Sequence, residues 1–344
     1  MKLLFDARWI RPKSPDGITR FSTELIKELS KSDIEITYLI NSKEQLLGLP
    51  KLNFILTNKP TSTKEVFQAK RLNRYNFDIV YTPNYIFGGI GRKFKLVRTV
   101  HDLIPFEHYN KNSNLTWKIF HSNKIGLKKF INDSDGLVTV SKTIKEELKK
   151  ITKSKISVVY NAPLDVDFKN TGESSKNIIY IGRYEPYKNV DFLIKSMDYL
   201  QDYKLILIGS CDKERRIELL NQSKSKDRIR FEGSVADKIY GNMLKHAFCL
   251  ATASKSEGFG LPVIEAMKIG CPVVCSDIAI FREIASGSAL FFNNNDIHDY
   301  VEKIKYLESG EVRKKLTSQG IDSAKKFSWI KSAHELKSIL SDVC

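Results

Sequence analysis

The chain has few cysteines, and their arrangement narrows the class of protein. Five cysteines occur among 344 residues, with no paired framework and no metal-ligand spacing to histidine. Cys249, Cys271 and Cys275 lie in apolar, strand-like runs, where a thiol behaves as a small hydrophobic group. We therefore expect a reducing compartment and not a secreted scaffold held by disulfides.

Long apolar runs are also missing. No stretch approaches the roughly 20 apolar residues that a membrane-spanning helix needs. The N-terminus opens on a short strand pattern at 2–5 and soon becomes charged, which is not the pattern of a signal peptide. We expect a cytoplasmic protein, either free or peripheral on the inner face of the plasma membrane.

The charge is strongly positive and unevenly distributed. The chain holds 56 Lys+Arg and 40 Asp+Glu, a formal net charge of +16. Residues 1–170 hold 30 Lys/Arg against 17 Asp/Glu, and the remaining residues hold 26 against 23. Such an excess suits an anionic membrane surface, a phosphorylated substrate or nucleic acid, or reflects only a lysine-rich proteome. No nucleic-acid recognition motif accompanies the charge, so we expect no nucleic-acid partner.

Strand and helix patterns alternate along the whole chain, which predicts parallel sheets covered by helices. The length suits two domains. We therefore predict an α/β protein with two Rossmann-like parallel-sheet domains that face a cleft. The predicted domains are residues 1–165 and 177–326, joined by a polar linker at 166–176.

Residues 256–267 (SEGFGLPVIEAM) form the most informative stretch, because they join two apolar runs that predict buried strands. Gly258 and Gly260 let the backbone approach a ligand, and the free N–H groups at a helix start bind anions. Glu257 precedes the predicted helix, and Glu265 lies about one turn inside it. The turn is predicted to hold a sugar phosphate.

Other candidate residues stand at the ends of predicted strands, where open α/β sheets bind ligands. Arg183 and Lys188 follow the first strand of the second domain and are suited to neutralise a departing diphosphate, although an exposed loop pair is the alternative. Gly17 begins the first helix, and His101 follows a strand. Each also has a structural alternative. Gly17 could only relieve a turn, and His101 could be a structural histidine paired with Asp102.

Together these motifs resemble the retaining nucleotide-sugar glycosyltransferases of family 4, in particular mannosyl- and rhamnosyltransferases of surface polysaccharide assembly. The resemblance rests on Arg183, Lys188 and 257–266 (EGFGLPVIEA), with support from 16–21 (DGITRF), 99–105 (TVHDLIP), 138–141 (VTVS) and 327–329 (FSW). It implies the two-domain architecture called GT-B, with a closing helix at about 327–344 that packs on the first domain. The implied reaction is transfer of a hexose or deoxyhexose from a nucleotide-sugar donor, with GDP-mannose as first choice. The implied acceptor is a glycan or a lipid-linked oligosaccharide, and no cofactor is expected.

The same resemblance assigns roles to individual residues. The implied donor-binding set is Gly17, Arg183, Lys188, Glu257, Gly258, Phe259, Gly260, Leu261 and Glu265. In this assignment Arg183 and Lys188 hold the diphosphate, and Glu257 holds the sugar. Glu265 holds the ribose, and His101 touches the sugar near its 6-position. The implied catalytic set is His101, Arg183, Lys188 and Glu257, with no dedicated protein base, because a phosphate oxygen takes the acceptor's proton.

Two further patterns concern metals and membranes. Residues 165–167 (DVD) have the form of a metal-binding Asp-x-Asp but lie at the predicted linker, so we predict a metal-independent enzyme. Basic, aromatic-bearing segments at 61–75 and 111–130 suit an anionic membrane surface, with ordinary solvated helix faces as the alternative. Two other functions stay open: a sugar-nucleotide epimerase of double-Rossmann form, which needs no acceptor, and a basic nucleic-acid-binding protein.

Overall fold

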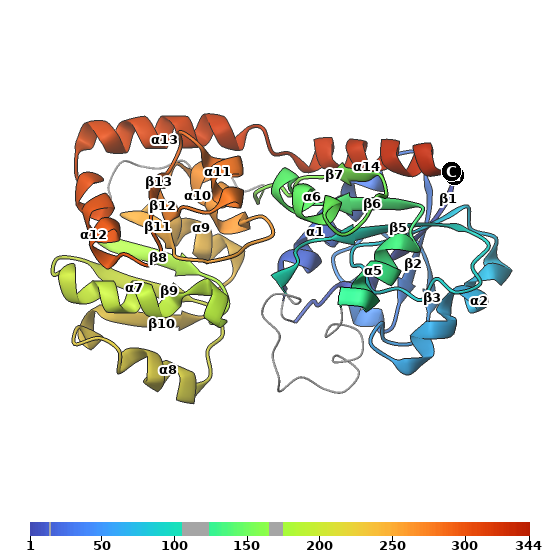
Figure 1. Cartoon of the computed structure of the whole chain (residues 1–344), viewed down its shortest axis with the longest axis horizontal. Coiled ribbons are helices and arrows are strands. Elements are labelled where there is room, and N and C mark those ends of the chain that lie inside the picture. The colour runs from blue at the N-terminus through green and yellow to red at the C-terminus, as the bar shows by residue number, and fades with distance from the viewer. Residues whose placement is uncertain (14, 105–123, 165–174) are drawn as a thin grey trace. The chain divides into compact units, whose positions relative to one another are not determined.

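The computed structural model describes residues 1–13, 15–104, 124–164 and 175–344. The chain divides into two compact units, and each is built on one parallel sheet. Unit 1 comprises residues 1–161 and 327–344, and unit 2 comprises residues 162–326. Figure 1 shows the labelled helices and strands of both units. The prediction of two Rossmann-like, parallel-sheet domains is confirmed.

Unit 1 holds a seven-stranded sheet in the order β3-β2-β1-β4-β5-β6-β7. The strands are β1 (Lys2–Asp6), β2 (Glu35–Ile40), β3 (Asn53–Leu56), β4 (Ile79–Thr82), β5 (Lys95–Val100), β6 (Gly136–Thr139) and β7 (Ile156–Val158). Central strands are buried at almost every residue and do not alternate, because helices cover both faces of the sheet. The strand order reverses between β1 and β4, which are parallel neighbours, so their carboxyl ends lie side by side.

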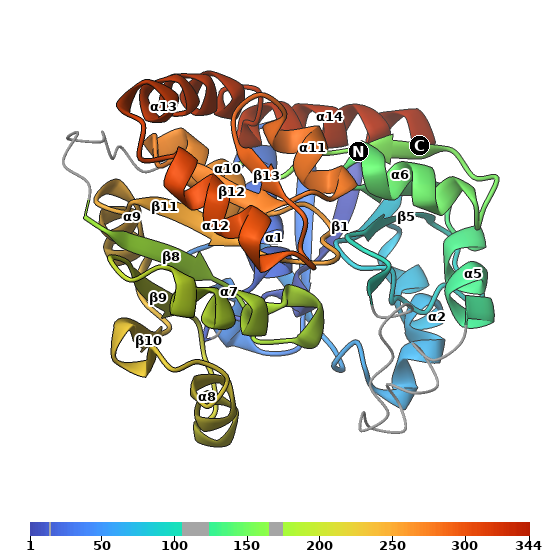
Figure 2. The ribbon, with the colours of Figure 1, turned by 60° about the vertical axis from the view of Figure 1, so that its left-hand side comes forward.

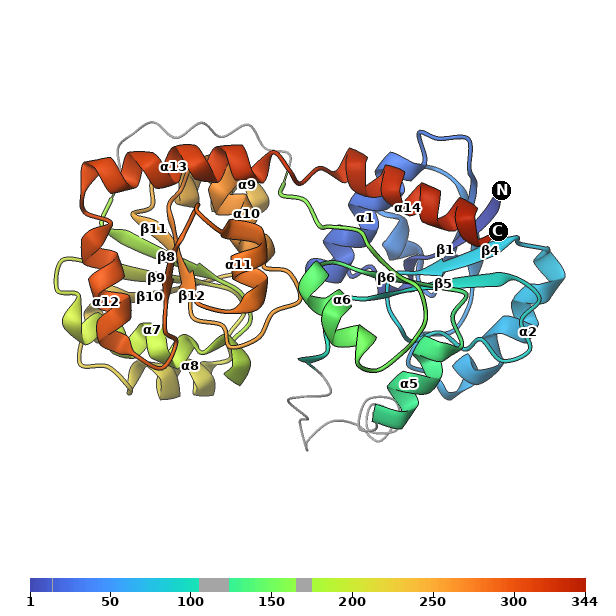
Figure 3. The ribbon, with the colours of Figure 1, turned by 45° about the horizontal axis from the view of Figure 1, so that its top comes forward.

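Helices cover both faces of the unit 1 sheet. One face carries α2 (Gln68–Leu72), α5 (Lys124–Asn132) and α6 (Lys142–Lys149). The other carries α1 (Gly17–Leu29) and α14 (Trp329–Val343), which pack against each other (Figure 3). The rings of Phe21 and Trp329 meet edge to face at 6.3 Å. The Ser332 hydroxyl donates to the carbonyl of Tyr160 at 2.6 Å, so the closing helix belongs to unit 1.

Residues 61–74 have helical spacing in the sequence, which predicts one continuous helix, and that prediction is wrong. That segment forms a 3₁₀ turn η3 (Thr63–Phe67), the short helix α2, and a second 3₁₀ turn η4 (Asn73–Tyr75). Glu65 and Gln68 are buried there, and Glu65 binds a distant arginine, so tertiary contacts override the helical spacing. Two further 3₁₀ turns, η1 (Ala7–Trp9) and η2 (Lys43–Leu46), follow β1 and β2.

Some predictions fall partly outside the described residues. The sequence pattern at 114–132 also predicts a helix, and this segment is described only from 124 onward, as α5. The predicted linker at 166–176 is described only at 175 and 176, and the Asp-x-Asp at 165–167 lies wholly outside.

Unit 2 holds a six-stranded sheet in the order β10-β9-β8-β11-β12-β13. The strands are β8 (Asn177–Ile181), β9 (Lys204–Ile208), β10 (Ile229–Gly233), β11 (Cys249–Thr252), β12 (Val273–Ser276) and β13 (Leu290–Phe292). The chain proceeds from β8 to β9 and β10 on one side, and from β11 to β12 and β13 on the other. The strand order therefore reverses between β8 and β11.

Two groups of helices cover the unit 2 sheet (Figure 2). One comprises α7 (Val190–Ser196), α8 (Lys213–Leu220) and α12 (Ile297–Tyr306). The other comprises α9 (Asp237–Lys245), α10 (Leu261–Ile269), α11 (Ala279–Ala285) and α13 (Gly310–Ala324). The sequence reasoning missed α11, whose seven residues are too few to show a clear helical period. Short 3₁₀ turns complete the unit: η5 (Pro186–Lys188), η6 (Met197–Tyr199) and η7 (Lys226–Arg228).

Candidate functional site

The candidate donor site of unit 2 lies at the point where the strand order reverses. Strands β8 and β11 are neighbours, with Ile178 opposite Cys249, and the chain leaves their carboxyl ends toward opposite edges of the sheet. Open α/β sheets bind ligands at such a switch point, because the two diverging turns leave a crevice between them. The predicted motifs at 183–188 and 257–265 follow these two strands.

Lys188 and Glu257, one from each turn, form an ion pair. Their Nζ and Oε1 atoms lie 2.5 Å apart, and their side chains are only 16% and 13% exposed. The same carboxylate oxygen accepts a hydrogen bond from the Ser254 hydroxyl at 2.8 Å. The backbone N–H of Lys255 donates to the carbonyl of Tyr187 at 2.8 Å, which adds a second link between the turns. The structure thus brings two of the predicted residues into direct contact.

Arg183 lies at the start of the same β8 turn. Its Nη2 donates to the Tyr187 hydroxyl at 3.0 Å, and its carbonyl accepts from the Tyr180 hydroxyl at 2.6 Å. Burial raises the pKa of Tyr180, and the nearby charge of Glu257 adds to that effect, so the phenol remains a donor. Gly182 has a φ of +155°, and a Cβ there would lie 2.9 Å from the Tyr180 hydroxyl oxygen. Tyr180 therefore fixes the turn that carries Arg183.

Ser254 is a site residue that the sequence reasoning missed. It is buried two residues after the end of β11, and its hydroxyl orients the Glu257 carboxylate. Its carbonyl accepts from the Ser276 hydroxyl at 2.5 Å, which fixes Ser254 against β12. The available signal was a serine just after a buried strand and three residues before the acidic residue, but serine is too common in turns for that spacing to be specific.

The glycine-rich turn ends at the start of α10. Gly260 caps that helix with a φ of +95°, and a Cβ there would lie 2.7 Å from Cε1 of Phe281. This position therefore requires glycine on both conformational and steric grounds. Phe259 is buried beside it, whereas Gly258 and Leu261 are partly exposed. Glu265 lies inside α10 and is 4% exposed.

In unit 1, Gly17 begins α1. The helix is capped by Asp16, whose carboxylate accepts from the backbone N–H of Thr19 at 2.8 Å and from its hydroxyl at 2.9 Å. Gly17 is helical and does not have a positive φ, so the conformational freedom of glycine is not what the turn uses. A small side chain at a helix start leaves the backbone N–H groups accessible to a ligand.

His101 follows β5 and is held by the loop after β4. Its Nε2 lies 2.9 Å from the carbonyl oxygen of Pro83, which only accepts, so this nitrogen carries the proton of the neutral ring. The Phe21 ring packs edge-on at 4.9 Å. Burial lowers the pKa of His101 to about 4, an effect that the Pro83 carbonyl and the charge of Asp16 oppose only in part. His101 is therefore a neutral hydrogen-bonding group at physiological pH.

We expect acid to destabilise the wild-type protein more than a His101→Gln variant. The unfolded chain binds a proton at this histidine near pH 6.5, whereas the folded protein does so only near pH 4. The free energy of unfolding therefore falls as the pH drops from about 6.5 to about 4, by up to about 1.4 kcal/mol per pH unit from this residue. Urea titrations across this range measure the slope. A His298→Gln variant, at an exposed histidine, is the control, and equal slopes for wild type and His101→Gln would contradict the assignment.

The predicted residues divide between the two units. Gly17 and His101 belong to unit 1, and all the other predicted site residues belong to unit 2. Among the residues that the structure describes, no cluster of three or more His, Cys, Asp or Glu side chains has the arrangement of a metal site. Within that same part of the chain, every helix is too short or too polar to span a bilayer.

Two Rossmann-like units, one with a cationic turn and an acidic, glycine-rich turn at its switch point, form the arrangement that the resemblance to GT-B glycosyltransferases implies. Family profiles described as "Glycosyl transferases group 1" and "Glycosyltransferase Family 4" match residues 164–326 and 15–163. The O-antigen chain mannosyltransferase RfbU of Salmonella typhimurium is 32% identical over 317 residues, which cover 86% of this chain and 88% of that protein. The chain belongs to the family 4 glycosyltransferases.

Other known proteins agree with this assignment. O-antigen chain mannosyltransferase B of Escherichia coli is 33% identical over 159 residues, covering 44% of this chain and 42% of that protein. Sucrose-phosphate synthase from Thermosynechococcus elongatus has a TM-score of 0.79 at 18% identity, covering 99% of this chain and 98% of that one. Anabaena Alr3699/HepE in complex with UDP and glucose has a TM-score of 0.77 at 16% identity, with 99% of both chains covered. These structures support the fold, and the relatives give no support to the epimerase alternative.

Proposed function

We propose that the protein transfers mannose from GDP-mannose to a glycan or lipid-linked oligosaccharide acceptor during assembly of a surface polysaccharide such as an O-antigen. The observation that carries the proposal is the Lys188–Glu257 pair at the switch point of unit 2. It places a cation suited to a diphosphate beside a carboxylate suited to sugar hydroxyls. Support for mannose comes from the two O-antigen mannosyltransferases among the relatives.

The Lys188–Glu257 ion pair suggests how the site would bind the nucleotide-sugar donor. In the ligand-free protein, Lys188 and Glu257 neutralise each other in a largely buried place. When the donor binds, the diphosphate takes over as the partner of Lys188, and Glu257 becomes free to accept from sugar hydroxyls. Ser254 keeps the carboxylate oriented through this exchange. Lys188 thus has an anionic partner in both states, and the Glu257 carboxylate always accepts hydrogen bonds, which limits the desolvation cost of holding either charge.

Catalysis would come mainly from stabilising the departing diphosphate. As the bond from the anomeric carbon to the diphosphate breaks, negative charge grows on the phosphates. Lys188 and Arg183 lie on one turn and would stabilise that charge. The proposed mechanism retains the anomeric configuration, and a phosphate oxygen takes the acceptor's proton, so no protein base and no metal is assigned.

The remaining residues are assigned to positioning. Glu265 would bind the ribose, and the backbone at Gly258, Phe259, Gly260 and Leu261 would line the sugar and diphosphate. In unit 1, Gly17 would let its loop approach the phosphates. His101 would offer its neutral ring to a sugar hydroxyl. We further propose that the enzyme acts as a peripheral protein at the inner face of the membrane.

A donor screen tests this proposal. Thermal unfolding is followed with GDP-, UDP- and dTDP-linked sugars, and GDP-mannose is expected to raise the melting temperature most, because a ligand stabilises the state that binds it. The transfer product is then examined by NMR, and an anomeric configuration equal to that of the donor is expected. A larger shift with another nucleotide would overturn the donor assignment. Conversion of the donor to an epimer without an acceptor would overturn the reaction itself.

A further inference from the structure

A basic groove runs along the outer edge of the unit 1 sheet, between the edge strand β3 and the segment formed by η3, α2 and η4. It has a volume of about 690 Å³. The described residues that line it include four cations and no carboxylate; the cations are Lys64, Lys70, Arg71 and Arg74. The proposed transfer reaction uses none of them.

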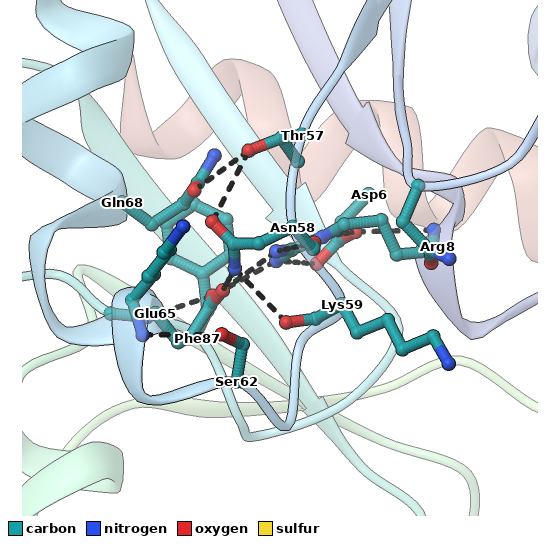
Figure 4. A network of polar contacts seen from close by, with 12 residues as sticks. Asp6, Arg8, Thr57, Asn58, Lys59, Ser62, Glu65, Gln68 and Phe87 are labelled. Carbon is teal, nitrogen blue, oxygen red and sulfur yellow. Dashed lines mark hydrogen bonds and ion pairs between the residues drawn. The ribbon is translucent and has the colours of Figure 1, made fainter.

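The positive charge of this groove is not balanced by its own segment. Residues 51–77 hold six Lys/Arg and a single acidic residue, Glu65. The Glu65 side chain is 2% exposed and points inward to Arg8, with its Oε2 atom 2.7 Å from Nη1 (Figure 4). Arg71 and Arg74 instead contact neutral groups, the side-chain oxygen of Asn58 at 3.3 Å and the Tyr75 hydroxyl at 2.8 Å.

Apolar side chains are exposed beside the cations. Leu56 and Tyr75 line the groove and are 59% and 38% exposed. Phe54 lies two residues before Leu56 on β3, therefore on the same face of the strand, and is 43% exposed. Eight large apolar side chains are exposed in the described part of unit 1, and five of them lie between residues 54 and 75. An edge strand with exposed apolar residues is a surface that proteins normally protect.

The groove is held in shape from behind. Asn58 belongs to its wall, and its carbonyl accepts from Nη1 of Arg8 at 3.2 Å. The Asn58 side-chain amide donates to Oε2 of Glu65 at 3.0 Å. Figure 4 shows how these contacts join the turn after β3 to the buried Arg8. The wall of the groove at Asn58 is therefore held in place by the fold itself.

We propose that this groove is the place where unit 1 binds an anionic membrane surface. The lipid phosphates would lie against the four cations. Leu56 and Phe54 would add apolar contacts in the interfacial layer, and Tyr75 would enter it with its apolar ring and polar hydroxyl, a combination that this layer favours. Each basic residue close to an anionic surface strengthens binding by about fivefold, and the apolar contacts add to that attraction.

The location also suits the proposed acceptor. Leu56 ends β3, and Thr57 and Asn58 follow it in the groove wall. One end of the groove therefore lies at the carboxyl edge of the sheet, the edge at which Gly17 and His101 follow their strands. A lipid-linked acceptor held in the same membrane would approach that edge. This use of the groove rests on the proposed transfer reaction, whereas the membrane contact itself can be tested without it.

Vesicle flotation of the full chain tests the inference. Wild type is expected to float with vesicles of phosphatidylcholine and phosphatidylglycerol, and not with phosphatidylcholine alone. A Lys70→Gln/Arg71→Gln/Arg74→Gln variant should bind about 100-fold more weakly. The control, Lys149→Gln/Lys150→Gln/Lys153→Gln, removes the same charge from exposed lysines at and beyond the end of α6 and should change binding less than about threefold. A Leu56→Ser variant should weaken binding without any change of charge.

Several outcomes would overturn the inference. The first is an equal loss of vesicle binding in the two triple variants. The second is equal binding of wild type to neutral and to anionic vesicles. The third is binding of duplex DNA that is as tight as vesicle binding and is weakened equally by the groove substitutions. Far-UV circular dichroism and melting temperature establish that each variant is folded. Transfer to a lipid-free saccharide is measured in parallel and should be unchanged by the groove variant. Absence of any transfer by wild type would refute the proposed function and leave the flotation result to decide the groove.

Discussion

Replacing Lys188 with alanine is expected to lower the rate of sugar transfer by about 100- to 1,000-fold, which is the usual effect of removing one group that stabilises developing negative charge. The side chain is largely buried and reaches across to the β11 turn, where Nζ meets Glu257 at 2.5 Å. The substitution removes the cation proposed for the diphosphate. The loss should appear mainly in kcat, since the charge on the diphosphate grows as the bond to the sugar breaks.

The design must separate chemistry from stability, because Lys188→Ala also leaves Glu257 without its cation. A Lys188→Ala/Glu257→Gln variant removes both charges, and it should recover thermal stability without recovering activity. Lys188→Arg keeps a cation and should retain more activity than Lys188→Ala. Lys195→Ala, at an exposed lysine of α7, is the matched control and should be neutral. A Lys188→Ala enzyme within threefold of the wild-type rate would refute the role.

Removing Arg8 is expected to produce the largest loss of stability, about 3–5 kcal/mol in the free energy of unfolding. Arg8 is buried between two carboxylates, with Nε 2.7 Å from Asp6 and Nη1 2.7 Å from Glu65. Both carboxylates raise the pKa of Arg8 in spite of burial, and burial raises the pKa of Glu65. Arg8→Ala leaves two uncompensated carboxylates in the interior, which is the costly outcome for a buried ion network. Urea unfolding at pH 7 measures the loss.

A neutral replacement of the whole network provides the internal control. The Asp6→Asn/Arg8→Met/Glu65→Gln variant removes all three charges of this network and should recover most of the stability that Arg8→Ala loses. Arg74→Ala, at an exposed arginine in the same region, should change stability by less than about 0.5 kcal/mol. If Arg8→Ala unfolds within 1 kcal/mol of wild type, the network does not hold the loops after β1 and β3 together.

Much of the architecture could be predicted because it depends on local patterns. The apolar runs predict the strands of both sheets. Ser141 directly follows one of these runs and predicts a helix cap, and in the structure its hydroxyl accepts from the backbone N–H of Ile144. The motifs also pointed to Lys188 and Glu257. Their contact could not be predicted, because they are 69 residues apart and meet only because β11 returns to lie beside β8.

The buried Arg8 network lies beyond sequence reasoning for a similar reason. Arg8 and Glu65 are 57 residues apart, and charged residues in such polar segments ordinarily face solvent. Burying Glu65 also breaks the helical period that had suggested one continuous helix at 61–74. The groove depends on that break, because its lining residues come from the end of β3 and from the three short pieces η3, α2 and η4. The sequence at 61–75 therefore indicated a basic surface, but the backbone path of that surface depends on the distant pair of Arg8 and Glu65.

The most direct test of the central claim is transfer of labelled mannose from GDP-mannose to a lipid-linked saccharide by the purified chain. The unit 2 turns after β8 and β11 are proposed to bind and activate the donor. The account predicts label in the acceptor, release of GDP only when acceptor is present, and loss of at least about 100-fold in Lys188→Ala. Transfer that is undiminished in Lys188→Ala, or no transfer from any nucleotide sugar, would contradict it.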